Sequence, residues 1–164
     1  MIKLILSLLF LVGLAVGAGL EASVPGEKPI QFSLAFSGTA FWEGYEDPYV
    51  SKGPYTIIGA TGRVDFNLGT WLIFAPEITL GFGGGMLGGT LNIRHRGFFA
   101  GAGIIALTFW PDDDESGIGL IWKFQAGIKG RSWIATAAYF TADPAESLAG
   151  RGAYGLQGSI GHIF

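Results

Sequence analysis

The chain has 164 residues, among them 28 Gly and no Cys, and a formal net charge of -3 at pH 7. This charge gives no indication of a nucleic-acid partner, and the lack of Cys excludes disulfides and thiolate metal sites. Only 14% of the residues are charged and the mean hydropathy is +0.44, whereas soluble domains are about 25% charged.

The amino end has the pattern of a secretory signal peptide. Lys3 precedes an apolar run over Leu4–Val16, and small residues follow, with candidate cleavage points after Ala18 and Ala22. A membrane-anchoring helix is the alternative, but the run is short for a span of about 20 residues. We therefore expect residues 1–22 to be removed.

The remainder, residues 23–164, is expected to form one domain of membrane strands. Eight segments have the length that a tilted membrane strand needs, about 9–11 residues or slightly more. In most of them apolar residues alternate with polar or small ones, as expected where one face meets lipid and the other meets a lumen. The segments are Ile30–Trp42, Tyr55–Phe66, Trp71–Phe82, Met86–Arg94, Phe98–Trp110, Ile118–Lys129, Trp133–Thr141 and Tyr154–Phe164.

Three details of these segments qualify the pattern. Phe98–Trp110 and Trp133–Thr141 are apolar or small on both faces, so the sequence does not assign their inward residues. Pro76 removes a hydrogen-bond donor in the middle of the third segment and predicts a bulge or a local break.

The connections alternate in length, as they do in membrane barrels. Those near residues 67–70, 95–97 and 130–132 are short and are expected in the periplasm. The connections at 43–54, 111–117 and 142–152 are longer and are expected outside, whereas the link at 83–85 is an exception.

The last segment ends in an aromatic residue, Phe164, after an alternating run whose lipid-side positions include Leu156 and Ile160. This end resembles the signal that the bacterial barrel-assembly machinery reads, although His162 departs from the usual pattern. The whole chain resembles the small eight-stranded outer-membrane proteins, the family of the OmpA membrane domain and OmpX.

That resemblance implies an all-β, eight-stranded, antiparallel, up-and-down transmembrane barrel in the bacterial outer membrane. It further implies a monomer without cofactor, surrounded by outer-membrane lipids and lipopolysaccharide and inserted by the assembly machinery. A soluble lipocalin-like barrel is the structural alternative. It would place charge outside, yet here the charged residues share the face opposite the aromatic and aliphatic stripes.

Six long or charged side chains are predicted to point inward, in a lumen about wide enough for side chains. Buried charges must be paired, so we expect Glu77 to interact with Arg63 and to be approached by Lys123. A polar core without a continuous pore is favoured over a conducting channel. The six residues are Arg63, Asp65, Glu77, Asn92, Arg94 and Lys123.

Four apolar residues, Phe41, Ile57, Leu107 and Ile121, are placed inward near the outer end, Leu107 only if its parity is inward. They either plug the barrel or form a cup that binds or transports a small hydrophobic ligand or lipid. A lipid-modifying enzyme is the less favoured form of this second hypothesis.

No catalytic or metal site is predicted. The lipid A deacylase family of similar barrels carries a His-x-Ser pair that is absent here, and His95 and His162 are interpreted as interfacial. Asp112–Glu115 is interpreted as a solvated loop tip because it lacks the ligand alternation of a cation-binding loop. With Tyr45–Tyr49, it is the most distinctive exposed chemistry, so surface interactions are expected there.

Overall fold

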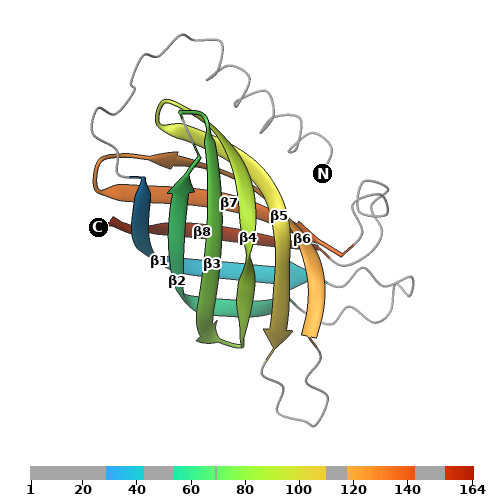
Figure 1. The fold of residues 1–164 in the computed structure, drawn as a ribbon. Coiled ribbons are helices and arrows are strands. Elements are labelled where there is room, and N and C mark those ends of the chain that lie inside the picture. Colours follow the sequence, from blue (N-terminus) through green and yellow to red (C-terminus); the bar gives the residue numbers. More distant parts are fainter. Residues whose placement is uncertain (1–28, 43–53, 69, 110–117, 143–153) are drawn as a thin grey trace.

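Eight antiparallel strands close into a barrel in chain order. The computed structural model describes residues 29–42, 54–68, 70–109, 118–142 and 154–164. Figure 1 shows the carboxyl end beside the start of β1, because β8 pairs back onto β1. The predicted all-β, up-and-down barrel is thus confirmed. Its strands are β1 (Ile30–Trp42), β2 (Tyr55–Asn67), β3 (Leu72–Phe82), β4 (Gly84–His95), β5 (Phe98–Phe109), β6 (Ile118–Lys129), β7 (Trp133–Thr141) and β8 (Tyr154–Ile163).

The strand boundaries differ from the predicted ones by one or two residues, most of all at the start of β4. This strand begins at Gly84 instead of Met86, because the connection from β3 is a tight hairpin in which Gly81 pairs with Gly84. Gly83 lies in this turn with a φ of 89°, a left-handed conformation that glycine adopts without steric cost.

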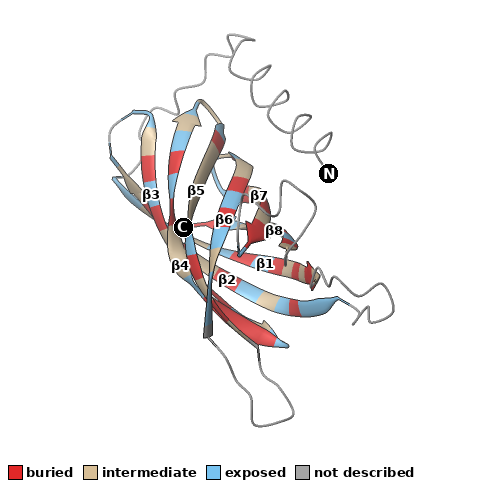
Figure 2. Ribbon diagram, turned by 90° about the vertical axis from the view of Figure 1, so that its right-hand side faces the viewer, coloured by how far each residue is buried: buried red, intermediate tan, exposed pale blue. Residues whose placement is uncertain are grey.

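Burial alternates along the strands in the sense predicted for a membrane barrel (Figure 2). Outward-facing Phe36 is 65% exposed and Ile160 is 64% exposed, whereas Lys123, on the inward face of β6, is 1% exposed. A soluble barrel would reverse this arrangement. An apolar outer wall around a polar interior is the arrangement that lipid requires.

The structure assigns the two strands whose faces the sequence left open. In β5 the inward side chains include Phe99, Ile105 and Leu107, and in β7 they include Ile134 and Phe140; all are at least nine-tenths buried. Leu107 therefore points inward, which was the condition for grouping it with Phe41, Ile57 and Ile121.

Pro76 coincides with a local break in the β2–β3 pairing, as predicted, and not with a bulge. The pairs run to Arg63↔Glu77 and resume at Phe66↔Phe74 in the same register. On its other side Pro76 still lies opposite Gly89. Since no residue is inserted, the inward alternation of β3 is preserved on both sides of the break.

Several expectations lie outside the described residues. They are the signal peptide, most of the three longer connections, and the two tips at Tyr45–Tyr49 and Asp112–Glu115. Across the described ranges, no helix has the length and apolarity needed to cross a membrane.

Candidate functional site in the barrel lumen

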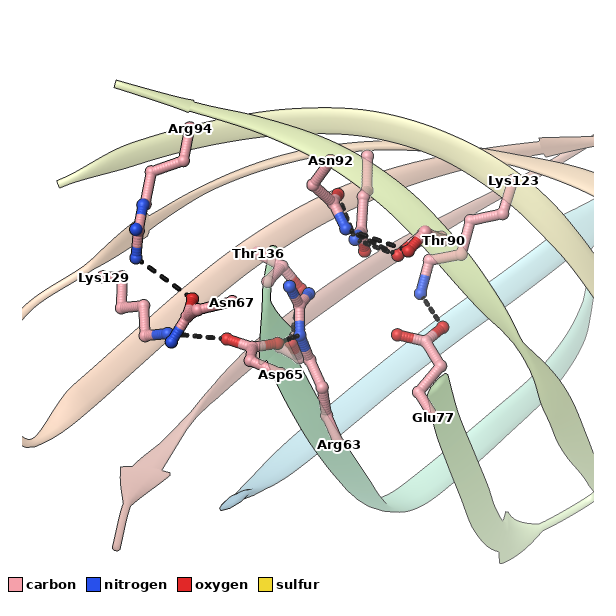
Figure 3. A network of polar contacts seen from close by, with 12 residues as sticks. Arg63, Asp65, Asn67, Glu77, Thr90, Asn92, Arg94, Lys123, Lys129 and Thr136 are labelled. Atoms are coloured by element: carbon pink, nitrogen blue, oxygen red, sulfur yellow. Dashed lines mark hydrogen bonds and ion pairs between the residues drawn. The ribbon is translucent and has the colours of Figure 1, made fainter. Parts of the chain in front are cut away.

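Two groups of ion pairs lie inside the barrel (Figure 3). The Asp65 carboxylate accepts a hydrogen bond from Arg63 Nε at 2.6 Å and another from Lys129 Nζ at 2.7 Å. The Glu77 carboxylate accepts one from Lys123 Nζ, which also donates to Gln157 Oε1 at 3.2 Å. All six residues are at least nine-tenths buried.

Arg63 does not pair with Glu77 as the sequence suggested, although the two residues are opposite one another in register. Its Nε bonds instead to Asp65, two positions along on the same face of β2, while Nη1 and Nη2 are buried without a hydrogen-bond partner. The guanidinium carbon lies 4.7 Å from the centre of the Phe99 ring, a cation–π contact that offsets part of its desolvation. Glu77 is held by Lys123, the second partner expected for it.

Asn92 belongs to a separate, neutral hydrogen-bond network. Its Nδ2 donates to Thr90 Oγ1 at 2.9 Å, and Gln125 Nε2 donates to Asn92 Oδ1 at 2.7 Å. Neither Asn92 nor Thr90 is more than 1% exposed. A buried amide of this kind is tolerated because its polar atoms find partners, so this network orders the β4–β6 side of the lumen.

Arg94 lies nearer the short-turn end than the other five predicted residues. It is half-buried, and its guanidinium donates to Asn67 Oδ1 at 3.1 Å and to the Thr70 carbonyl at 3.2 Å. These bonds tie the end of β4 to the β2–β3 turn. Arg94 therefore belongs to the rim of the barrel.

Three long inward side chains of these networks, Lys129, Gln125 and Gln157, are absent from the six predicted residues. Lys129 and Gln125 have the inward parity that β6 showed in the sequence, and Gln157 has the inward parity of β8. Charge and parity together were sufficient to add Lys129. The hydrogen bonds of the two amides depend on which strands face one another across the lumen, and alternation alone carries no such information.

The four predicted apolar residues meet at the end of the lumen where the longer connections lie. Phe41, Ile57 and Leu107 are buried in one cluster, and Ile121 packs against it. The Phe41 and Phe140 rings are 5.4 Å apart between centroids. The other cluster members, which the sequence did not single out, are Met86, Ile105, Ala138 and Phe140.

A smaller apolar cluster of Phe99, Ile134 and Ile163 lies toward the opposite end. The ion pairs are interleaved with the two apolar clusters, because Lys123 lies opposite Phe140 and Lys129 lies opposite Ile134 in the β6–β7 register. Between strands β1 and β2, Thr61 Oγ1 donates to Ser37 Oγ at 2.9 Å.

The described residues contain no group of three or more His, Cys, Asp or Glu side chains that could hold a metal ion. His95 and His162 are exposed. An open apolar depression lies on the outer wall, lined by residues that include Phe74, Gly89 and Trp122. It belongs to the outward surface and is separate from the lumen.

Comparisons with known proteins give only a distant likeness. No family model matches the chain, and no curated protein matches it significantly. Two solved structures of Ail, the attachment invasion locus protein of Yersinia pestis, are similar at 13% identity and a TM-score of 0.44 each. One, in complex with the heparin analogue sucrose octasulfate, matches over 82% of this chain and 97% of Ail. The other matches over 84% and 100%. At this similarity nothing about function follows from them.

Proposed function

We propose that the chain is a bacterial outer-membrane β-barrel with a plugged lumen, whose role is structural and surface-interacting. The observation that carries this is the inverted burial pattern. Leu120 is 72% exposed on the outside of β6, while Lys123 on its inner face is 1% exposed. Such a wall is stable in lipid, and a closed barrel leaves no strand edge unpaired there.

Packed side chains along the lumen support the plug. Two apolar clusters lie toward the two ends of the barrel, and buried ion pairs are interleaved with them. A continuous water path would have to pass both clusters and the ion pairs. The long cationic side chains of Lys123 and Lys129 are engaged by carboxylates and reach across the lumen.

The surface role is assigned to the connections at the outer end, because loops on a rigid scaffold carry function. We propose outer-membrane lipids and lipopolysaccharide as the surroundings of a monomer. Insertion by the barrel-assembly machinery is proposed to depend on Phe164. No enzymatic activity is proposed, because the interactions in the described part of the lumen are ion pairs and hydrogen bonds, with no nucleophile–base pair among those residues.

Cell fractionation and an unheated gel test this proposal together. The full chain should collect in the outer membrane and migrate faster before heating, because a closed barrel resists detergent unfolding. Deleting Phe164 should reduce accumulation of the folded band. Phe82→Ala is the matched control, since Phe82 is an exposed phenylalanine, 88% accessible, at the opposite end of the barrel. Equal accumulation of all three chains would contradict the assembly role of Phe164.

The second candidate function is binding of a small hydrophobic ligand or lipid at the outer apolar cluster. The convergence of Phe41, Ile57 and Leu107 with Phe140 favours the site, while their mutual packing favours the plug. Native mass spectrometry of the purified barrel separates the two. A stoichiometric lipid that disappears in Phe140→Ala would establish binding, whereas a bare mass would support the plug.

A further inference from the structure

Charge is divided unequally between the two ends of the barrel. By sequence, the three longer connections contain nine Asp or Glu residues and only two cationic residues, Lys52 and Arg151. The opposite end has Arg94 at the end of β4, Arg96 in the β4–β5 turn and Arg131 in the β6–β7 turn. Asp65, the acidic side chain two residues before the end of β2, is buried and already held by two cations.

The two turns that carry Arg96 and Arg131 are neighbours. The Lys129 backbone N–H donates to the Gly97 carbonyl at 2.7 Å, which joins the end of β6 to the β4–β5 turn. The Arg94 backbone N–H donates to the Trp71 carbonyl, also at 2.7 Å. The three arginines therefore lie along one continuous arc of the rim, from the start of β3 to the β6–β7 turn.

Exposed aromatic residues mark the level of this arc. Trp71 is 58% exposed, Trp133 is 45% exposed and Phe98 is 40% exposed. Exposed Trp at the ends of membrane strands sits at the headgroup region, where the ring has one dry and one wet edge. The arginines of the same arc are thus at the depth of lipid phosphates.

Arg96 has a backbone conformation that its side chain does not favour. Its φ is 59°, and it is the one non-glycine residue in the described ranges with a positive φ. Glycine would occupy this position without strain, and the next residue, Gly97, is one. Strain that persists in a turn suggests a requirement for the side chain. Arg96 Nη1 is also enclosed without a hydrogen-bond partner.

We propose that Arg96 and Arg131 of this arc bind the headgroup of an anionic phospholipid in the periplasmic leaflet, next to Arg94, whose guanidinium is bonded to Asn67 and Thr70. The guanidinium fork matches phosphate oxygens, and each cation near an anionic membrane surface strengthens the attraction. The inference depends on the proposed membrane location and adds a lipid preference and an orientation to it. The short-turn end faces the leaflet that supplies glycerophospholipids.

Native mass spectrometry of the full chain, released from vesicles of equal phosphatidylcholine and phosphatidylglycerol, tests the arc. We expect phosphatidylglycerol to be retained in preference to phosphatidylcholine. Arg96→Gly removes the cation and the backbone strain together, so this variant should fold at least as well. Its preference for phosphatidylglycerol should fall about fivefold, the contribution expected of one arginine.

Arg151→Gly is the matched control, since it removes the same charge from a connection at the opposite end, and it should keep the preference. An unchanged lipid ratio in Arg96→Gly, or an equal loss in Arg151→Gly, would overturn the inference. Abolition of the preference by millimolar inorganic phosphate would also overturn it. The same holds if the Arg96→Gly variant keeps its lipid preference and loses only its co-sedimentation with peptidoglycan. Failure of the full chain to insert into vesicles would instead contradict the proposed function.

Discussion

At the scale of single residues, Asp65 has the most demanding position in the lumen. Its carboxylate is shared by Arg63 and Lys129, and the buried charged residues of the described chain are three cations and two anions. Arg63 is the cation whose terminal nitrogens lack hydrogen-bond partners. Removing Asp65 would leave two buried cations without a counterion, whereas removing Arg63 leaves each carboxylate with one lysine.

We therefore expect Asp65→Asn and Arg63→Met to differ sharply in stability. Asp65→Asn should cost about 3–5 kcal/mol, since it breaks a buried ion pair from one side. Arg63→Met should be close to neutral, because an apolar side chain of similar length replaces an incompletely paired charge. The midpoint of urea unfolding, followed by the shift between folded and unfolded gel bands, measures both. A larger loss in Arg63→Met than in Asp65→Asn would contradict this assignment.

The Glu77–Lys123 pair gives a second prediction at this scale. In a double-mutant cycle, Glu77→Ala and Lys123→Ala should show a coupling energy of about 1–3 kcal/mol, because the two side chains are in direct contact. The matched cycle of Glu77→Ala with Arg63→Ala should give a smaller coupling, since Arg63 bonds to Asp65. Equal couplings in the two cycles would mean that Glu77 interacts with both cations.

The residue-level site could be predicted in part. Parity and charge indicated that Arg63, Asp65, Glu77, Asn92 and Lys123 would point inward, and the structure places them there, buried. The predicted partner of Arg63, Glu77, was wrong. Cross-strand register brings the two Cα atoms together, but it does not determine which carboxylate a flexible guanidinium reaches.

At the scale of strands, inward-facing glycines allow close approach of neighbouring backbones. Gly59 and Gly81 face one another in the β2–β3 ladder. A Cβ built on Gly59 would lie 2.0 Å from the Leu80 carbonyl oxygen and 2.4 Å from Gly81 Cα. Both are backbone atoms of the partner strand, so the clash could be relieved only by moving that strand.

Gly59→Ala should accordingly destabilise the barrel by about 1–3 kcal/mol, the usual cost of overpacking. Gly38→Ala is the matched control, because a Cβ at Gly38 would meet nothing within 4 Å. Urea midpoints of the two variants in the same detergent provide the comparison. Equal midpoints would show that the β2–β3 backbones can separate at little cost.

The sequence was sufficient to predict all eight strands. It was sufficient to predict which side chains of a strand face the lumen only in some of them. Where lipid and lumen demand different residues, as in β1 and β3, alternation fixed both the strand and its inward side. In β5 and β7, small residues such as Gly101 and Ala137 satisfy either side, so the parity of Leu107 and Phe140 followed only from pairing with β4, β6 and β8.

At the scale of the whole molecule, the packing of apolar side chains against the ion pairs explains how a narrow barrel can contain charge. Lys123 lies opposite Phe140 of the outer cluster, and Lys129 lies opposite Ile134 of the lower cluster. Charges in such an interior attract one another strongly because water is scarce. The sequence indicated the closed barrel through strand count and connection lengths, but not the lower cluster, since Ile134 and Phe99 belong to the two strands of open parity.

Single-channel recording in a planar bilayer tests the plugged barrel most directly. The account predicts that the purified full-length monomer, shown to be inserted by its heat-dependent gel shift, gives no steady conductance in about 1 M potassium chloride. Phe140→Ala together with Ile105→Ala, which opens the outer apolar cluster, should remain closed as long as the Glu77–Lys123 and Asp65–Lys129 pairs span the lumen. Steady single-channel conductance from the unaltered monomer would contradict the plug and establish a pore.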